Sequence, residues 1–200
     1  MSLHWYGDRA LLLDTASPLT LGAAVQLAAP VGLVDVVPGA ASVLVCFTGP
    51  AQATAALVGL RSLQPVEAAL TSQTEVVVLP TVYDGADLDH VAAATGCSVA
   101  QVVSRHSTGR YVVAVTGFTP GFGYLSGLDR VLHLPRRAEP RTVVPAGSVA
   151  IADRWTGVYP VASPGGWHLL GHTAAVLWDL DRDPPTLLRP GVQVRFEPVR

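Results

Sequence analysis

Three blocks between residues 117 and 173 decide the fold: GFTPGFGYL (117–125), PRRAEPRTVVPAGSVAI (135–151) and YPVASPGGWHLLGHT (159–173). Each block combines Pro and Gly with aromatic and polar residues, a composition that sets backbone turns and packs rings against them. No helical period survives beyond residue 117. Short apolar runs follow instead, at residues 143–144, 148–152, 158–160, 167–170, 174–178 and 192–196. Many short strands punctuated in this way predict a β-barrel or a β-sandwich.

The part of the chain before these blocks alternates strands and helices. Apolar or β-branched runs predict strands at 9–14, 33–37, 42–47 and 65–71. Segments that begin at a proline and carry one apolar face predict helices at 18–29 and 50–63. The order strand, helix, strand, strand, helix, strand is that of a split βαβ unit. We therefore expect a ferredoxin-like domain with two helices on one face of a four-stranded antiparallel sheet.

The polar sequence TSQT (71–74) marks the predicted domain boundary, with one domain at residues 1–72 and the other at residues 73–200. Beyond it we predict a strand at 75–79, helices at 87–94 and 98–107, and a strand at 111–116. Ser98 and Gln101 have the spacing of a capping box at the start of the second helix. The predicted fold class is α+β, with an N-terminal α/β domain followed by a barrel or sandwich.

The composition argues against several classes of protein. Half of the residues are hydrophobic and 14% are charged, yet no apolar run reaches the roughly 18 residues of a membrane span. A formal net charge of −2 and a pI near 6.3 argue against a nucleic-acid partner. The N-terminus lacks the basic and apolar regions of a signal peptide, so we expect a cytoplasmic protein. Cys46 and Cys97 have neither zinc-ligand nor disulfide spacing.

Familiar catalytic motifs are not supported either. His168 and His172 lie four residues apart, but WHLLGHT predicts a strand, on which the two rings would lie about 13 Å apart. We therefore predict no metal site. The sequence AGSVA around Ser148 lacks the glycine spacing of a G-x-S-x-G motif, which favours a turn or pocket hydroxyl. All 13 basic residues are arginine, so a phosphate loop with its lysine is excluded.

Arginines, one histidine and several rings are the remaining candidates. Arg136, Arg137 and Arg141 cluster in PRRAEPR, where a guanidinium can clamp a carboxylate or phosphate, although a solvated loop beside Glu139 is an equal alternative. His106 lies near the end of a predicted helix, whose dipole would stabilise a protonated ring, in a capping or a catalytic role.

The aromatic residues of the blocks, each beside a Pro or Gly, either fill the core or line a small-ligand pocket or partner surface. They are Phe118, Phe122, Tyr124, Tyr159 and Trp167.

The three blocks together resemble the KipI-type family, also known as the B component of the multi-subunit enzyme 5-oxoprolinase or as allophanate hydrolase subunit 1, which corresponds to the carboxyltransferase C-D subdomains. The resemblance spans nearly the whole chain, from GDRAL (7–11) through YDG (83–85) to the three blocks. Long blocks in the right order are far more specific than any single short motif. The sequence departs from the family pattern at residues 153–155 and at His172, where arginine is common.

The resemblance implies a ferredoxin-like N-terminal domain and a cyclophilin-like C-terminal β-barrel. It also implies a larger KipA-type partner (the C component of 5-oxoprolinase or allophanate hydrolase subunit 2), in a heterodimer or heterotetramer, with a third subunit in 5-oxoprolinase. In that family the complex opens 5-oxoproline to glutamate with ATP and Mg²⁺, and the resemblance implies that this chain holds no tightly bound cofactor and is inactive alone. Two alternatives stay open: amide hydrolysis or carboxyl transfer on urea-derived compounds, and non-enzymatic inhibition of a histidine kinase.

The residues and the resemblance together predict the site. Catalytic roles fall to His106, Arg137, Arg141 and Ser148. The predicted substrate-binding residues, mostly from the turns and rings of the blocks, are Pro120, Gly121, Phe122, Tyr124, Pro145, Tyr159, Ser163, Gly165, Gly166, Trp167 and His172.

Overall fold

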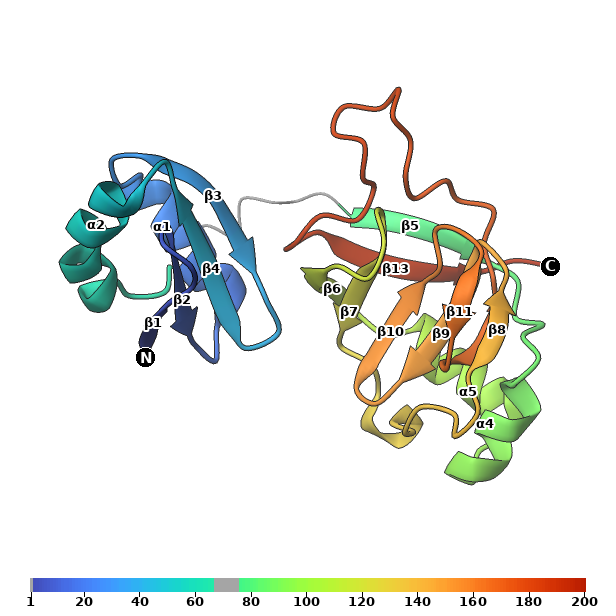
Figure 1. The fold of residues 1–200 in the computed structure, drawn as a ribbon. Helices are drawn as coiled ribbons and strands as arrows, with labels where there is room; N and C mark the ends of the chain where they lie inside the picture. The colour runs from blue at the N-terminus through green and yellow to red at the C-terminus, as the bar shows by residue number, and fades with distance from the viewer. Residues whose placement is uncertain (1, 67–75) are drawn as a thin grey trace. The chain divides into compact units, whose positions relative to one another are not determined.

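The computed structural model describes residues 2–66 and 76–200, and the chain divides into two compact units, Met1–Thr74 and Glu75–Arg200 (Figure 1). The domain boundary predicted between residues 72 and 73 lies outside the described residues, as does most of the strand predicted at 65–71. Each unit has a hydrophobic core of its own.

The first unit is a four-stranded antiparallel sheet with two helices on one face. Its elements are β1 (Leu3–Trp5), β2 (Ala10–Asp14), α1 (Pro18–Ala28), β3 (Leu33–Pro38), β4 (Ser42–Phe47) and α2 (Pro50–Ser62). Each helix has a proline in its first turn, where the missing N–H leaves no hydrogen bond unmade. Alternate residues Val43, Val45 and Phe47 of β4 share one core with both helices, so both helices cover the same face. The predicted helices and hairpin are confirmed.

One edge of this sheet is a strand that the sequence patterns do not predict. β1 pairs with β2 through Leu3 opposite Leu13, which gives the strand order β1-β2-β4-β3. Three residues are too few to show an alternation of apolar and polar side chains. Among the described residues, the start of the chain therefore supplies the fourth strand.

The second unit is built on a seven-stranded sheet with the order β12-β9-β10-β7-β6-β13-β5 (Figure 1). Its elements are β5 (Val76–Thr81), α4 (Leu88–Thr95), α5 (Val99–Ser107), β6 (Tyr111–Thr116), β7 (Gly123–Ser126), the 3-10 helix η1 (Arg130–Leu132), β8 (Arg141–Val144), β9 (Ser148–Ala152), β10 (Trp155–Val158), β11 (Ser163–Gly165), β12 (His168–His172) and β13 (Gln193–Pro198). The two end strands meet where the backbones of Val82 and His172 exchange hydrogen bonds of 2.9 and 2.8 Å. We call this contact the barrel seam. It makes the sheet a nearly closed barrel, so the barrel alternative is confirmed.

Two glycines allow the close backbone contact at the barrel seam. A Cβ atom on Gly171 would overlap the carbonyl oxygen of Val82, and one on Gly85 would overlap the backbone of Leu169. Such overlap is not relieved by a side-chain rotation, because the neighbouring atoms belong to backbone. The YDG turn and the third block, far apart in the sequence, thus meet at one point.

Strand β9 separates two cores of the barrel unit. Val149 and Ile151 lie in the inner core, which the barrel strands enclose, whereas Ala150 and Ala152 lie in a second cluster on the opposite face. We call this second cluster the outer cluster; its buried members are Phe122, Val144, Ala150, Ala152, Tyr159, Trp167 and Leu169. A separate two-stranded sheet of β8 and β11 adds to this side of the barrel.

Helices α4 and α5 pack on the inner core through Leu88, Val91 and Val102. The predicted capping box of α5 is confirmed, with Ser98 Oγ accepting from the Gln101 amide and Gln101 Oε1 accepting from the Ser98 amide.

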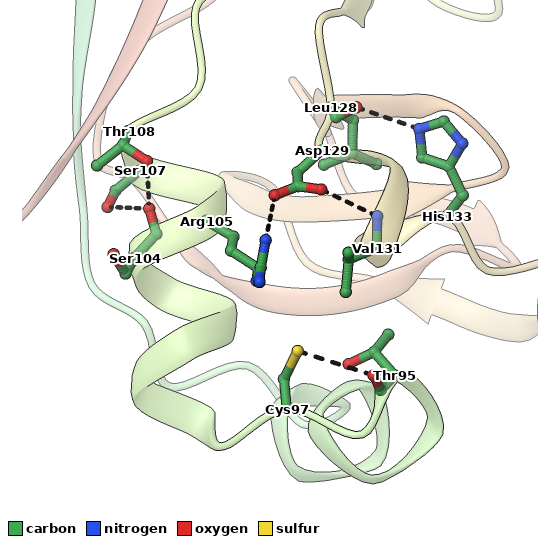
Figure 2. A network of polar contacts seen from close by, with 10 residues as sticks. All are labelled: Thr95, Cys97, Ser104, Arg105, Ser107, Thr108, Leu128, Asp129, Val131 and His133. Carbon is green, nitrogen blue, oxygen red and sulfur yellow. Dashed lines mark hydrogen bonds and ion pairs between the residues drawn. The ribbon is translucent and has the colours of Figure 1, made fainter.

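Figure 2 shows how the end of α5 is tied to the 3-10 helix η1: Arg105 binds Asp129 at 2.7 Å. The other carboxylate oxygen of Asp129 caps η1 by accepting from the Val131 amide. The hydrogen bond from the Val131 backbone N–H lowers the pKa of Asp129 most, and the hydrogen bond from Arg105 lowers it further.

Short or Gly-rich strands account for most of the remaining differences. Strands β7 (GYLS) and β11 (SPG) were not predicted, because Gly and Pro interrupt any alternation. The apolar run at 174–178 does not form a strand and makes only an isolated bridge between Trp178 and Thr186. No helix within residues 2–66 and 76–200 is long and apolar enough to cross a membrane.

Candidate functional site

A cavity of about 230 Å³ opens beside the outer cluster of the barrel unit. We call it the aromatic pocket. Rings, prolines, glycines and a single arginine line it: Phe118, Phe122, Tyr124, Tyr159, Trp167, Pro140, Pro164, Gly165, Gly166 and Arg136. The three sequence blocks therefore converge on one cavity, and six of the predicted substrate-binding residues meet there.

Phe122 is the hub of the aromatic walls. Its ring centroid lies 5.0 Å from that of Tyr124 and 5.5 Å from those of Tyr159 and Trp167, all in edge-to-face arrangements. Phe122, Tyr159 and Trp167 are at most 4% exposed. Rings packed in this way are held by several neighbours at once, so the pocket is largely preformed.

Tyr159 and Gly165 fit together at the wall of the pocket. A Cβ atom on Gly165 would overlap the Tyr159 hydroxyl, so only glycine leaves room for the phenol. Burial raises the pKa of Tyr159, although the backbone amide of Trp167, by hydrogen bonding, opposes that rise. The phenol is therefore neutral at neutral pH.

Arg137 and Arg141 share one buried carboxylate. Asp87 Oδ1 accepts from Arg137 Nη1 at 2.6 Å and from Arg141 Nη2 at 2.8 Å, while Oδ2 accepts from the Leu169 amide at 2.8 Å. Burial alone would raise the pKa of Asp87, but these hydrogen bonds and both positive charges outweigh it and lower the pKa. Both arginines therefore bind a carboxylate of this chain, and their catalytic roles stay predictions.

Arg136 differs from its two neighbours. Its side chain is exposed and lines the aromatic pocket, and it makes no hydrogen bond or ion pair with any of the described residues. The backbone beside it is fixed, because the Arg137 amide donates to the Gly166 carbonyl at 2.8 Å. In the sequence, Arg136 is a member of the arginine cluster but not of the predicted site.

Phe118 stands between the aromatic pocket and a second cavity of about 300 Å³. Its φ of 71° is in the left-handed region, which is uncommon for a residue with a side chain. Pro120 and Gly121 line the second cavity together with Trp178, so these two predicted binding residues lie outside the aromatic pocket.

The remaining turn residues have other partners. Ser148 Oγ donates to the Pro145 carbonyl at 2.8 Å, which closes the turn before β9. Ser163 Oγ is buried and has no partner within the described part of the chain. His172 lies at the barrel seam, where its exposed ring binds Asp84 at 2.8 Å. The catalytic role of Ser148 and the binding roles of Pro145, Ser163 and His172 stay predictions.

His106 is enclosed in the inner core and is 0% exposed. The Thr156 hydroxyl donates to the Ala150 carbonyl, so it accepts from His106 Nε2–H at 2.8 Å, and the Tyr83 hydroxyl donates to Nδ1 at 2.7 Å. Burial lowers the pKa of His106 to about 3. The expectation of a protonated ring at the helix end is therefore wrong. The ring is neutral, holds one tautomer and lies away from the solvent.

His168 and His172 both lie on β12, which confirms the predicted strand. A bulge between Leu169 and Gly171 turns the two rings to different surroundings. His168 is buried, donates from Nε2 to the Pro135 carbonyl and stacks on His90 with ring centroids 5.3 Å apart. Within residues 2–66 and 76–200, no three His, Cys, Asp or Glu side chains form a metal-binding group.

Comparison with protein families shows which family has this architecture. The family model for the carboxyltransferase domain, subdomains C and D, matches residues 1–188. The chain belongs to this carboxyltransferase C-D family. The match covers both units, including the aromatic pocket and the barrel seam.

Three relatives of this C-D family member carry the same name. The chain is 44% identical to the B component of 5-oxoprolinase of Escherichia coli O157:H7 over 203 residues, which cover 96% of this chain and 93% of that protein. It is also 44% identical to the B component of 5-oxoprolinase of Bacillus subtilis (strain 168), over 60% of this chain and 52% of that protein.

Solved structures show the same C-D fold. TTHA0988 superposes with a TM-score of 0.81 at 36% identity, over 96% of this chain, and this chain spans 40% of TTHA0988. The conserved uncharacterized protein PH0987 of Pyrococcus horikoshii has a TM-score of 0.61 at 30% identity, with 99% of this chain and 97% of that chain covered. Urea carboxylase of Kluyveromyces lactis, at 22% identity and a TM-score of 0.70, shares the fold over 22% of its length.

Two polar residues of this C-D domain were not predicted for the site from the sequence. Asp87 looked like the acidic start of a helix, but its side chain makes no cap and binds the arginines instead. The sequence signal was the segment PRRAEPR, in which three arginines have one acidic neighbour, Glu139, so that a carboxylate from elsewhere in the chain is needed to balance their charge. Arg136 lines the pocket and Arg137 binds Asp87 because their side chains point in different directions, and the sequence of a loop does not specify these directions.

Proposed function

We propose that this chain is a subunit of an enzyme complex that opens the ring of 5-oxoproline to glutamate with hydrolysis of ATP. The observation that carries the proposal is the 44% identity with the B component of 5-oxoprolinase of Escherichia coli O157:H7, over nearly the full length of both proteins. The urea carboxylase and urea amidolyase structures, at 22% identity, share only the fold and give no support for a reaction on urea.

The aromatic pocket supports this proposal because its size and walls suit a small flat ring. A cavity of about 230 Å³ is slightly smaller than the roughly 300–1,000 Å³ of most small-molecule sites, which suits a single small ring, and its rings present apolar faces and edges to the methylene groups of a five-membered lactam. Turn glycines at 165 and 166 leave backbone close to the cavity. In this proposal, the chain binds and orients the substrate ring and shields it from water.

The described residues do not fit the triphosphate of ATP or its magnesium ion. Arg137 and Arg141 already share Asp87, and no three metal-ligating side chains come together in the described ranges. We therefore derive no step through ATP on this chain. We propose instead that ATP and Mg²⁺ bind on a larger KipA-type subunit, in a cytoplasmic heterodimer or heterotetramer, with a third subunit completing the complex.

Reconstitution of the complex tests the proposed function. The chain, the larger subunit and the third subunit are purified together and separately, and 5-oxoproline-dependent ATP hydrolysis and glutamate release are measured. We expect activity from the complete complex and none from this chain alone. A complete complex without 5-oxoproline-dependent ATP hydrolysis would overturn the proposal.

A pocket variant links the activity to this chain. Tyr124→Ala removes a wall of the aromatic pocket, and we expect the KM for 5-oxoproline to rise roughly tenfold in the complex. Trp155→Leu is the matched control, because Trp155 packs on the outer cluster without lining the cavity. Equal effects of the two substitutions would show that packing, and not the pocket, sets the KM.

A further inference from the structure

The three arginines between residues 136 and 141 are held in different ways. Arg137 and Arg141 share Asp87, whose side chain is 4% exposed. Arg136 has no ion pair within the described residues, and its side chain lines the aromatic pocket. The ion pairs of Asp87 and the backbone bond from Arg137 to Gly166 hold the segment, so Arg136 extends from a braced backbone.

The aromatic pocket places this free guanidinium beside weakly polar walls. Arg136 is the charged member of a lining that otherwise consists of rings, prolines and glycines. Glu139, the acidic residue of the same segment, lines a different cavity with His90 and His168. Burial raises the pKa of Tyr159, and the charge of Arg136 is among the influences that oppose the rise, so its field reaches the phenol in the pocket wall. A charge beside apolar walls attracts an opposite charge more strongly than one in water.

We infer that Arg136 recognises the ligand of the aromatic pocket through a carboxylate, and that the pocket takes a small ring carrying one such anionic group. This inference rests on the proposed function and names the residue that binds the substrate carboxylate there. A guanidinium can form two parallel hydrogen bonds to a carboxylate, which gives orientation as well as affinity. The rings then enclose the apolar part of the ligand. Arg136 is thus a specificity residue that selects the acid over its uncharged amide.

Kinetics of the complex test this role. The carboxylate of 5-oxoproline is not the reacting group, so its contact with Arg136 contributes equally to the bound substrate and the transition state. We expect Arg136→Gln to raise the KM for 5-oxoproline roughly tenfold to a hundredfold with kcat nearly unchanged. Arg136→Lys keeps the positive charge but cannot form two parallel hydrogen bonds to a carboxylate. Its KM should therefore lie between those of the wild type and Arg136→Gln. A fall in kcat with an unchanged KM would overturn the assignment.

The matched control is Arg154→Gln. Arg154 is also exposed and lies 4.7 Å over the Trp155 ring, outside the aromatic pocket. The substitution removes the same charge from the same unit, so we expect its KM to equal that of the wild type. An equal rise in KM for both variants would mean that net charge, and not a contact in the pocket, is responsible.

Binding to the full 200-residue chain separates this inference from the proposed function. The probes are cyclopentanecarboxylate and cyclopentanecarboxamide, followed through NMR shifts of pocket residues. We expect the wild type to prefer the carboxylate by roughly tenfold and Arg136→Gln to lose that preference. A preference that survives in Arg136→Gln, or a wild type that binds neither probe, would overturn the inference. Selective binding without 5-oxoproline turnover by the complex would overturn the proposed function alone.

Discussion

Strand β9 has two buried faces with different properties. Val149 and Ile151 point into the barrel, whose core of aliphatic and aromatic side chains encloses the His106 ring. Ala150 and Ala152 point the other way, and their small side chains lie in the outer cluster with the rings of Phe122 and Trp167. Small residues on one face thus make room for the large rings that wall the aromatic pocket.

The polar groups of the two regions show what this difference means. Inside the barrel, both nitrogens of His106 have partners and the ring stays neutral. In the outer layer, Arg136 is charged and has no partner in the described part of the chain. A buried polar group with all its hydrogen bonds made stabilises a fold, whereas an unpaired charge at a cavity is available to a ligand. The contacts of His106 therefore stabilise the fold, whereas Arg136 is the group that we infer to bind a ligand.

The largest effect should come from opening the inner region at the barrel seam. In Gly171→Ala the new methyl group would overlap the Val82 carbonyl, so we expect a loss of roughly 4 kcal/mol or more in the free energy of unfolding by denaturant. Gly117→Ala is the control, because a Cβ there has no neighbour within 4 Å. Equal stability of the Gly171 variant and the wild type would show that the seam is not tightly packed.

The next effect concerns the brace behind the aromatic pocket. Asp87→Asn leaves Arg137 and Arg141 without their counter-charge, and we expect a loss of about 3 kcal/mol in thermal and denaturant unfolding. Asp89→Asn, in the first turn of α4, should lose less than about 1 kcal/mol. Because the folded pKa of Asp87 is lowered, its contribution is present above the ordinary value of 3.8 and is lost as the pH falls through the folded pKa. If Asp87→Asn were as stable at pH 7 as Asp89→Asn, Asp87 would not stabilise the fold through Arg137 and Arg141.

Thr156→Val tests the closed hydrogen bonding of the inner region. The substitution removes the acceptor of His106 Nε2–H in the core, and we expect a loss of about 2 kcal/mol in unfolding free energy. Thr142→Val, on an exposed position of β8, should change stability by less than about 0.5 kcal/mol. Catalytic constants of the complex should be unchanged in both variants, and a selective fall in kcat for Thr156→Val would return His106 to a catalytic role.

The pH dependence of stability gives an independent test of the neutral His106. Its folded pKa is lowered to about 3 from an ordinary value of 6.5, so the unfolded chain takes up a proton first as the pH falls. The wild type should therefore lose about 1 kcal/mol between pH 6.5 and pH 5.5 from this group. In His106→Gln that part of the slope should disappear, as measured by denaturant unfolding across this range. An identical slope in the variant would show that another group titrates.

Phe118→Gly should have the smallest effect on stability and a clear effect on the pocket. Glycine relieves the left-handed backbone at φ 71°, while the lost packing of a ring that is 61% exposed opposes this gain. We expect the unfolding free energy to change by less than about 1 kcal/mol. Ligand binding should weaken, because the wall between the two cavities is removed. Phe118→Leu retains the left-handed backbone and serves as the control. Tighter ligand binding by Phe118→Gly than by the wild type would show that Phe118 does not form a wall of the pocket.

Much of the fold follows from local sequence. Prolines at the start of α1 and α2 and the capping box of α5 predicted these helices within a residue or two, because such contacts join residues close in the chain. The three blocks predicted a turn-rich strand region, and they left open whether its rings fill the core or line a pocket or partner surface. Strands β1, β7 and β11 were not predicted, since three or four residues are too few to show a period and Gly or Pro interrupts β7 and β11.

The sequence by itself determined the kinds of residue available to the site: arginines without lysine, rings beside turns, and glycines where backbones must meet. Only the tertiary structure decided their states. Asp87, 50 residues before Arg137, pairs with that arginine, while Arg136 has no ion pair within residues 2–66 and 76–200, and the enclosed barrel makes His106 neutral. Charge and accessibility depend on which distant groups come within hydrogen-bonding distance and on how much water remains around them, and neither is specified by neighbours in the chain.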